Sequence, residues 1–353
     1  MAPNRLPPSI RIVLVVSVVM ASLTACASAP AAPAASEPVT IRVGYFPNIT
    51  HSQALIGISR GDFQKALGSD VIIDAKTFNA GPSVIEALFA RQLDLSYIGP
   101  NPAINGYVQS KGEALRVVAG ATSAGAAFIV RPEAGIRSPQ DLHGKKLASP
   151  QLGNTQDVAL RAYLGSNGLK PTDQGGDVEV IPTANPGILD LFRAGQIDGA
   201  WVPEPWASRL IVDAGGELFL DERELWPDGQ FTTALIIVST EFLAKHPDIV
   251  ETWLRTHVEL TTWELAHPDE AKALSNAQIE QLTGKALSQA VLDEAWSRMA
   301  PTYDPLPATL LASADSAFQA GFLKEKPQLK GIFDLAGLNR VLQSQGLEQI
   351  QTP

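Results

Sequence analysis

Short apolar runs alternate with amphipathic segments along most of the chain. Residues 39–45 alternate apolar and polar side chains, which is typical of a strand, and residues 52–67 carry apolar side chains at helical spacing. Strands that alternate with helices predict βαβ units. The same pattern predicts further strands at residues 71–78, 93–98, 115–121, 126–130, 146–148, 178–181, 199–202 and 235–239, and helices at residues 83–91, 103–110, 157–167, 188–194 and 207–214.

The pattern changes after residue 240. From there on the apolar spacing is almost purely helical, and strands are scarce. The predicted helices lie near residues 241–266, 268–282, 288–299 and 307–321. The sequence therefore predicts an α/β region followed by a helical one.

The first residues have a different character. Arg5 and Arg11 precede an uncharged apolar run at residues 12–20, as in a signal peptide. A membrane-spanning helix needs about 20 apolar residues, so we expect residues 1–25 to be a cleaved leader and not a permanent span. Residues 27–38 are small and Pro-rich, which is typical of a tether.

Cys26 is the only cysteine of the chain. It cannot form an intramolecular disulfide, and a structural zinc site needs four ligands. The segment Leu23-Thr-Ala-Cys26 resembles the bacterial lipoprotein box, in which the cysteine is lipidated before cleavage. That resemblance implies a lipidated N-terminus and tether at residues 26–38, anchored at the extracytoplasmic face of the cell membrane. The alternative is an ordinary signal peptide with an incidental cysteine.

Composition limits the classes of function. The chain has 353 residues, 45% of them apolar and 18% charged, which suffices for a large core and suggests about two domains. Its net charge is −10, so the basic footprint of a nucleic-acid-binding protein is missing. The phosphate-loop pattern and the His-Glu-x-x-His pattern are also missing. The histidines are scattered along the chain, and the residues indicate neither a metal site nor a catalytic one.

Two segments of the chain echo each other. Residues 85–102 align with residues 189–205 through Leu-Phe pairs, an aspartate (Asp94 or Asp198) and a Pro-x-Pro end. Each copy predicts a helix, a tight turn, a strand and a Pro-bounded loop. The alternative is coincidence among common turns. A true repeat would give two similar α/β lobes with equivalent loops at their strand ends, which is where ligands of open α/β sheets bind.

Several motifs occur in a fixed order and together resemble a known family. They are Gly44-Tyr-Phe-Pro-Asn-Ile-Thr-His51, Phe78-Asn-Ala-Gly-Pro82, Asp94-Leu-Ser-Tyr-Ile-Gly-Pro-Asn-Pro102, Asp141-Leu-His-Gly-Lys-Lys146 and Gly195-Gln-Ile-Asp-Gly-Ala-Trp-Val-Pro-Glu-Pro-Trp206. This series is similar to that of the solute-binding proteins of ABC importers in the aliphatic sulfonate, nitrate and taurine group. The resemblance covers residues 39–338.

The resemblance implies an α/β fold, namely a two-lobed, periplasmic-binding-protein-like clamp of type II. Each lobe would be a mainly parallel sheet flanked by helices, and the chain would cross between lobes twice, near residues 120–126 and 227–234. Lobe 1 would contain residues 39–122 plus 232–353, and lobe 2 residues 123–231.

The resemblance also implies a function. The expected protein is a monomer without cofactor or catalysis that binds a small-molecule ligand, most simply an aliphatic sulfonate, and delivers it to an ABC permease and its ATPase. Alternatives are a binding protein for nitrate, taurine or a pyrimidine precursor of thiamine, a pyrimidine-precursor synthase on the same fold, and a ligand-sensing domain. The synthase reading expects His and Cys chemistry, and the only cysteine lies in the leader.

The loops suggest where the ligand binds. Asn154 or Thr155 can cap the helix that follows, Asn101-Pro102 and Gly81-Pro82 are similar helix starts, and Gly153 permits close approach to the backbone. Helix N-termini carry free donors and partial positive charge, which suits a sulfonate, carboxylate or phosphate. The alternative is ordinary capping without a ligand.

Aromatic and acidic residues lie in the same loops. Tyr45, Trp201 and Trp206 are expected either to wall the ligand or to belong to the core. Glu204 is expected either to meet an amino group of a zwitterionic ligand or to cap a helix, and His51 to bind or to cap. The loops themselves hold no Arg or Lys. The full set of candidate ligand-binding residues is Tyr45, Asn48, His51, Gly81, Gly99, Asn101, Thr122, Ser123, Gly153, Asn154, Thr155, Trp201, Glu204 and Trp206.

Overall fold

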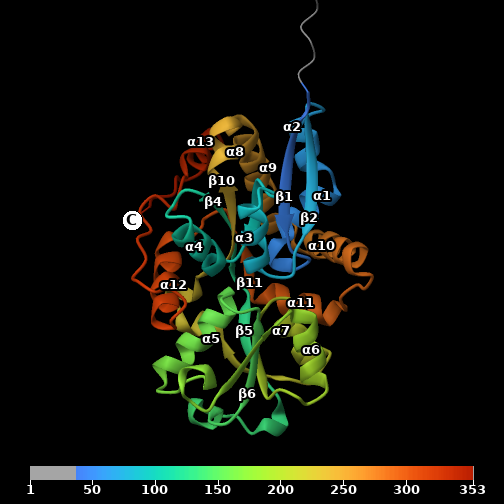
Figure 1. Ribbon diagram of the computed structural model, residues 1–353. Coiled ribbons are helices and arrows are strands. Elements are labelled where there is room, and N and C mark those ends of the chain that lie inside the picture. Colours follow the sequence, from blue (N-terminus) through green and yellow to red (C-terminus); the bar gives the residue numbers. More distant parts are fainter. Residues whose placement is uncertain (1–36, 353) are drawn as a thin grey trace, which may run out of the picture. The chain divides into compact units, whose positions relative to one another are not determined.

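The predicted alternation forms two separate β-sheets in the computed structural model, which describes residues 37–352. The predicted leader and Cys26 lie outside the described residues. A six-stranded sheet has the order β11-β4-β10-β3-β1-β2, and a five-stranded sheet has the order β7-β6-β8-β5-β9. Figure 1 shows the first toward the top and the second, in green and yellow-green, toward the bottom. The expected α/β fold is confirmed.

The strands of the two sheets come from different stretches of the chain. The six-stranded sheet contains β1 (Val39–Tyr45), β2 (Val71–Thr77), β3 (Leu95–Ile98), β4 (Leu115–Ala124), β10 (Thr232–Ser239) and β11 (Met299–Pro301). The five-stranded sheet contains β5 (Ala126–Val130), β6 (Lys146–Pro150), β7 (Glu179–Thr183), β8 (Gly199–Pro203) and β9 (Glu217–Asp221). The chain passes from one sheet to the other at Gly125, whose φ of 83° suits glycine.

Both sheets are mixed, which corrects the expectation of mainly parallel sheets. The strand β1 runs parallel to β2 and β3, but β10 is antiparallel to β3 and β4, and β11 is antiparallel to β4. In the other sheet β6 is parallel to β7 and β8, whereas β5 is antiparallel to β8 and β9. The reason is the path of the chain, since β4 leads out of the six-stranded sheet and β10 leads back into it.

The helices lie where the amphipathic segments predict them, but several differ from the predicted helices in length. The predicted helix at residues 52–67 is broken at Gly61 (φ 73°). The predicted helix at 241–266 is broken at His246, because Pro247 disfavours helical geometry in the residue before it. The sequence did not predict β9, β11 or α13. The helices are α1 (Ser52–Ser59), α2 (Asp62–Leu67), α3 (Gly81–Phe89), α4 (Pro100–Gln109), α5 (Thr155–Ser166), α6 (Asn185–Arg193), α7 (Trp206–Val212), α8 (Thr240–Lys245), α9 (Pro247–Ala266), α10 (Pro268–Thr283), α11 (Gln289–Ser297), α12 (Pro307–Gln319) and α13 (Ala336–Ser344).

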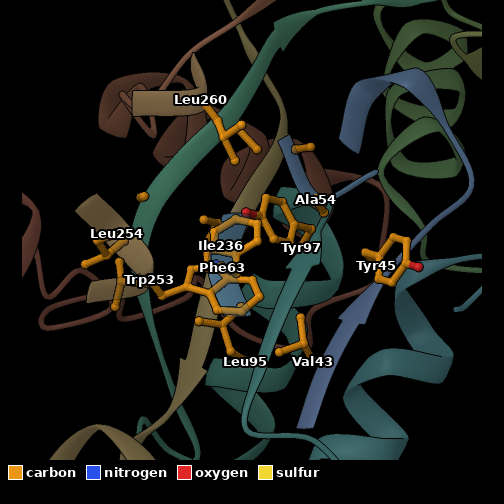
Figure 2. Packing of buried hydrophobic residues seen from close by; sticks show 14 of the residues in the cluster. Val43, Tyr45, Ala54, Phe63, Leu95, Tyr97, Ile236, Trp253, Leu254 and Leu260 are labelled. Carbon is orange, nitrogen blue, oxygen red and sulfur yellow. The ribbon is translucent and has the colours of Figure 1, made fainter. Parts of the chain in front are cut away.

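The largest apolar cluster lies between the six-stranded sheet and the C-terminal helices. The rings of Phe63 and Trp253 stack at 3.7 Å with an interplanar angle of 6°. Val43, Leu95 and Ile236 come from three neighbouring strands and are fully buried beside these rings. Figure 2 shows Tyr45 at the edge of this group, with its hydroxyl pointing away from the other labelled residues. The helices after residue 240 therefore complete the core of the six-stranded sheet.

Within residues 37–352, none of the helices has the length and apolar character that crossing a bilayer requires.

Polar groups are buried in the same layer. The Tyr97 hydroxyl and Nδ1 of His257 are 3.1 Å apart, and Nε2 of His257 lies 2.8 Å from the Gly120 carbonyl. Burial lowers the pKa of His257 to about 4. Ser52 Oγ donates to Glu264 Oε2 at 2.6 Å, and burial raises the pKa of Glu264 from 4.5 to about 8. Glu264 is therefore protonated in the folded protein at neutral pH.

We expect Glu264 to make stability depend on pH. Because its folded pKa lies above its unfolded pKa, its contribution is fully present below about pH 4.5 and is lost as the pH rises through 8. Between pH 5 and 8 the free energy of unfolding should fall by on the order of 3 kcal/mol more in the wild type than in Glu264→Gln. Urea titrations at several pH values measure this difference. Glu259→Gln, on the exposed face of the same helix, should leave the pH dependence unchanged, and equal slopes in the wild type and Glu264→Gln would contradict the prediction.

Candidate functional site

A small polar pocket lies between segments of the two sheets. One side comes from residues that follow β1, β2 and β3, and the other from the ends of β8 and the starts of α5 and α6. Its volume is about 20 Å³, which is room for little more than one water molecule. The lining residues are Phe46, Asn48, Thr50, His51, Asn79, Gly99, Asn154, Thr155, Gln156, Asn185, Pro203 and Thr233.

Several helices begin at this pocket. Asn154 is the N-cap residue of α5, as predicted, and Gly99 is that of α4. Asn185 is the first residue of α6, and Asn79 lies two residues before α3. None of these four helices has a side-chain hydrogen bond at its N-cap. Free backbone donors and the positive ends of the helix dipoles are therefore gathered around one small volume.

Three buried polar atoms of the pocket have no hydrogen-bond partner. They are Thr155 Oγ1, Asn185 Oδ1 and Thr233 Oγ1, and their residues are only 5%, 4% and 5% exposed. A buried polar atom without a partner costs about 1–3 kcal/mol. The three belong to α5, α6 and β10, so they approach the pocket from different sides. This arrangement suits a small polar ligand that supplies the missing hydrogen-bond partners.

The pocket has no formal charge of its own. Its lining contains no Lys, Arg, Asp or Glu, and burial lowers the pKa of His51 to about 3, so its imidazole is neutral. The Phe46 N–H donates to His51 Nδ1 at 3.2 Å, and the two rings stack at 4.4 Å. His51 precedes α1 but makes no side-chain cap. Any field that attracts an anion here comes from backbone dipoles and not from a cation.

Two contacts join the opposite sides of the pocket. Trp206 Nε1 donates to Asn48 Oδ1 at 3.0 Å. A Cβ placed on Gly99 would lie 2.3 Å from Thr155 Oγ1, so the absence of a side chain at Gly99 lets Thr155 approach. Trp206 is half-buried, and the Arg209 guanidinium lies 4.5 Å from its ring centre. The polar pocket is thus closed by close packing at one side and by a hydrogen bond at the other.

The structure brings together part of the predicted set. Asn48, His51, Gly99, Asn154 and Thr155 line the pocket, and Trp206 contacts it through Asn48. Sequence reasoning missed the other lining residues. Asn185-Pro186 carries the same Asn-Pro signal at a helix start that singled out Asn101-Pro102, and Asn79 lies within a motif already noted. The residues missed are Phe46, Thr50, Asn79, Gln156, Asn185, Pro203 and Thr233.

Two of the predicted aromatic residues lie elsewhere. Trp201 is fully buried in the five-stranded layer, where it stacks on Phe128 and donates to Glu222 Oε2 at 2.7 Å. Tyr45 belongs to the core of the six-stranded layer, and burial raises the pKa of its hydroxyl. Both are core residues because a strand buries its side chains on both faces when helices cover both faces.

Two predicted polar residues pair with other parts of the chain. Glu204 accepts from the Ser208 N–H and Oγ, each at 3.0 Å, and forms an ion pair with Arg298 at 3.0 Å. It accepts from a backbone N–H in the first turn of α7 and contacts no pocket residue through its carboxylate, although the N-cap position itself is Pro205. Asn101 lies inside the first turn of α4, where its Oδ1 accepts from Ser313 Oγ at 2.9 Å. It is not an N-cap, because the helix already begins at Pro100.

The remaining predicted residues serve the packing of the fold. A Cβ on Gly81 would lie 2.3 Å from the Pro102 ring, so this glycine lets α3 approach α4. Thr122 Oγ1 donates to the Thr50 carbonyl at 2.6 Å, and Ser123 lies in β4 between β10 and β11. The Gly153 N–H donates to Asp157 Oδ2 at 2.8 Å. None of these four lines the pocket.

The arrangement is suited to binding a polar molecule. Within residues 37–352 no group of three His, Cys, Asp or Glu side chains is placed to hold a metal ion. The pocket offers backbone N–H groups, threonine hydroxyls and asparagine amides, which can donate to the oxygens of a guest and accept from its N–H or O–H groups.

Comparison with known proteins finds a family, and several relatives that are named as binding proteins. The model of the NMT1-like family matches residues 34–279. The taurine-binding periplasmic protein of Escherichia coli is 27% identical over 212 residues, which are 60% of this chain and 63%, less than two thirds, of that protein. A Brucella abortus protein named only as a binding protein is 29% identical over 266 residues, 72% of this chain and 79% of that one.

Solved structures share the fold. The alkanesulfonate-binding protein SsuA of Xanthomonas axonopodis pv. citri, bound to MOPS, gives a TM-score of 0.71 at 21% identity and covers 85% of this chain and 100% of its own. The periplasmic nitrate-binding protein NrtA of Synechocystis gives 0.73 at 14% identity, over 87% of this chain and 89% of its own. These likenesses confirm the periplasmic-binding-protein-like fold.

We expect Gly99→Ala to hold the two sides of the pocket apart. The new Cβ would lie 2.3 Å from Thr155 Oγ1, whereas ordinary contacts begin near 3.4 Å, so the Gly99 and Thr155 backbones should separate by about 1 Å in a crystal structure. Removing the obstructing atom in Gly99→Ala/Thr155→Ala should restore the original spacing. Gly165→Ala is the matched control, because nothing lies within 4 Å of its Cβ position. Unchanged spacing in Gly99→Ala would count against a closed contact at this point.

Proposed function

The chain belongs to the NMT1-like family, and on that premise we propose that it is an extracytoplasmic solute-binding protein of an ABC importer. Its ligand would be a small organic anion, foremost an aliphatic sulfonate, delivered to a membrane permease with its ATPase. The observation that carries this proposal is the neutral pocket at three helix starts with three unpartnered polar atoms. The names of the taurine-binding and alkanesulfonate-binding relatives support it.

The chemistry of the pocket fits a sulfonate head group. Three oxygens that share one negative charge accept from several donors at once, and helix N-termini stabilise the charge without a cation. The backbone N–H groups at the starts of α5 and α6, with the Thr155 and Thr233 hydroxyls, are the donors in this arrangement, whereas α4 begins with Pro100 and Pro102, which have no N–H. Such a pocket also accepts nitrate, which the name of a structural relative supports.

An amino-bearing sulfonate such as taurine is the second candidate ligand. Asn185 Oδ1 is a buried acceptor without a donor, and an alkyl sulfonate or nitrate has no N–H or O–H group to offer it. An ammonium group would supply that donor. The 27% identity to a taurine-binding protein points the same way.

The clamp movement follows from the division of the chain. We assign residues 39–122 plus 232–353 to lobe 1 and residues 123–231 to lobe 2. The pocket takes residues from both, with Asn48, Gly99 and Thr233 on one side and Thr155 and Asn185 on the other. A monomer that closes on its ligand therefore needs no residue from a second copy.

Binding without catalysis agrees with the residues available. The only cysteine is Cys26, so a synthase that depends on a cleft cysteine has no nucleophile of that kind. Gly57-Ile-Ser-Arg-Gly61 matches a hydrolase pattern, but Ser59 Oγ donates to the Ile56 carbonyl at the end of α1. That position is not the strand-to-helix turn which exposes a catalytic serine.

We expect titration calorimetry with ethanesulfonate, taurine and nitrate to show heat for at least one sulfonate. Thr155→Ala and Asn154→Ala should each weaken that binding by about 1–3 kcal/mol, or roughly 5- to 150-fold, if they donate to the anion. Ser166→Ala, at the far end of the same helix, is the control. Absence of heat from both sulfonates would refute the sulfonate assignment, and unchanged affinity in both variants would remove this loop from the site.

We expect the exported protein to carry lipid on Cys26. Two or more acyl chains anchor a protein stably, so the wild type should fractionate with membranes and incorporate labelled palmitate. Cys26→Ser should do neither, although it should still be exported. A wild type that takes up no palmitate and fractionates with the soluble proteins, as Cys26→Ser does, would show that the segment is an ordinary cleaved leader.

A further inference from the structure

Arg298 joins α11 to the turn that follows β8. It is 5% exposed and lies between the end of α11 and the start of β11. Its Nη1 lies 3.0 Å from Glu204 Oε1 and 3.1 Å from Ser208 Oγ, and its Nη2 contacts Glu294. Because β11 pairs with β4 of the six-stranded sheet, this guanidinium ties the five-stranded layer to a segment of the other layer.

The partner of Arg298 lies in a turn that borders the pocket. Glu204 is fully buried, and its N–H donates to the carbonyl of Gly125, the residue at which the chain passes between the sheets. Pro203 lines the pocket, and Trp206 donates to Asn48 of the pocket. The residues on both sides of Glu204 thus face the candidate site, while Glu204 itself faces away from it. Figure 1 shows α11 and α7 at the junction of the two layers, where they pack together.

We propose that Arg298 is a positioning residue for the pocket: through Glu204 it holds the turn Pro203–Trp206 against α11 and so sets where Pro203 and Trp206 meet the six-stranded layer. The contact lies beside the chain crossing and not at the mouth of the pocket. The contact therefore holds Glu204 in place, and the position of the rest of the turn depends on it. This role holds whatever ligand the pocket takes.

The charges around Glu204 explain why the cation is needed. Burial raises the pKa of Glu204, and Arg298 opposes that rise. The other charged groups near the pair are Glu294, Asp221 and Arg223. Arg223 is committed to Asp221, with which it forms an ion pair at 2.7 Å. Without Arg298 the turn would hold a buried carboxylate with no cation of its own, a situation that is strongly destabilising where it has been measured.

The test follows the indole N–H groups of two tryptophans in the full-length protein without ligand. Trp206 Nε1 donates to Asn48 across the pocket, whereas Trp201 Nε1 donates to Glu222 within the five-stranded layer. Solvent-exchange rates of the two indole protons are measured by NMR, with Trp206→Phe for assignment. In Arg298→Met we expect exchange at Trp206 to accelerate at least tenfold and exchange at Trp201 to stay within twofold of the wild type.

Further variants separate positioning from general loss of stability. Arg298→Met/Glu204→Gln removes the unpaired charge together with the contact, so the Trp206 rate should stay at least threefold above the wild type, and a return to the wild-type rate would show that Arg298→Met acts through the buried charge alone. Arg42→Met breaks an ion pair with buried Asp94 inside the six-stranded layer and should leave Trp206 unchanged. An unchanged Trp206 rate in Arg298→Met, or an equal rise at Trp201, would overturn the proposal. If Arg298→Met does not fold, Glu204→Gln decides, since at least a threefold rise confined to Trp206 supports the role and no rise overturns it.

Discussion

The rest of the structure depends on one constraint. Uncharged polar groups are buried at the place where several helices begin. Three helix N-termini, two threonine hydroxyls and an asparagine oxygen surround about 20 Å³. Backbone donors at a helix start are fixed by the helix itself, so their direction cannot adjust when the pocket closes. The pocket can close only if the two layers meet in one arrangement, and the contacts at Gly99 and Trp206 provide it.

The acidity of the chain is compatible with the proposed anionic ligand. The net charge is −10, yet charges exposed to solvent are screened within about 8–10 Å at physiological salt, while helix ends act within about one turn. Asp157, the acid nearest the start of α5, is already used by Ser149, Gly153 and Arg161. Glu204 is held by Arg298. The acids near the site are therefore neutralised by protein partners. The electrostatic field in the pocket then comes from the helix dipoles.

Sequence reasoning succeeded where local patterns decide. The alternation of strands and helices gave most of the elements, and Asn154 at the start of α5 followed from capping chemistry. It failed where long-range pairing decides. Trp201 and Trp206 look alike in sequence, but the first fills the core and the second reaches Asn48. The partner of Glu204 lies at residue 298, and no local pattern indicates a pair so far apart. The strands β9 and β11 form by pairing along the path on which the chain returns between the sheets. The strand β11 has only 3 residues.

In the proposed clamp, the unpartnered atoms would also make closure depend on the ligand. Closing an empty pocket removes Thr155, Asn185 and Thr233 from bulk water and leaves their oxygens unpaired, at about 1–3 kcal/mol for each atom. One water molecule in 20 Å³ makes at most about four hydrogen bonds and has two hydrogens to donate. A ligand with several acceptors and one donor would satisfy all three atoms and the backbone N–H groups together, but it is larger than 20 Å³, so the two layers must stand further apart around it than they do here. The closed arrangement is then favoured only when the ligand supplies these bonds, because a ligand shifts an equilibrium by its difference in affinity for the two states. In the proposed clamp, polar atoms that weaken the closed arrangement without a ligand are in this way the source of the coupling between binding and closure.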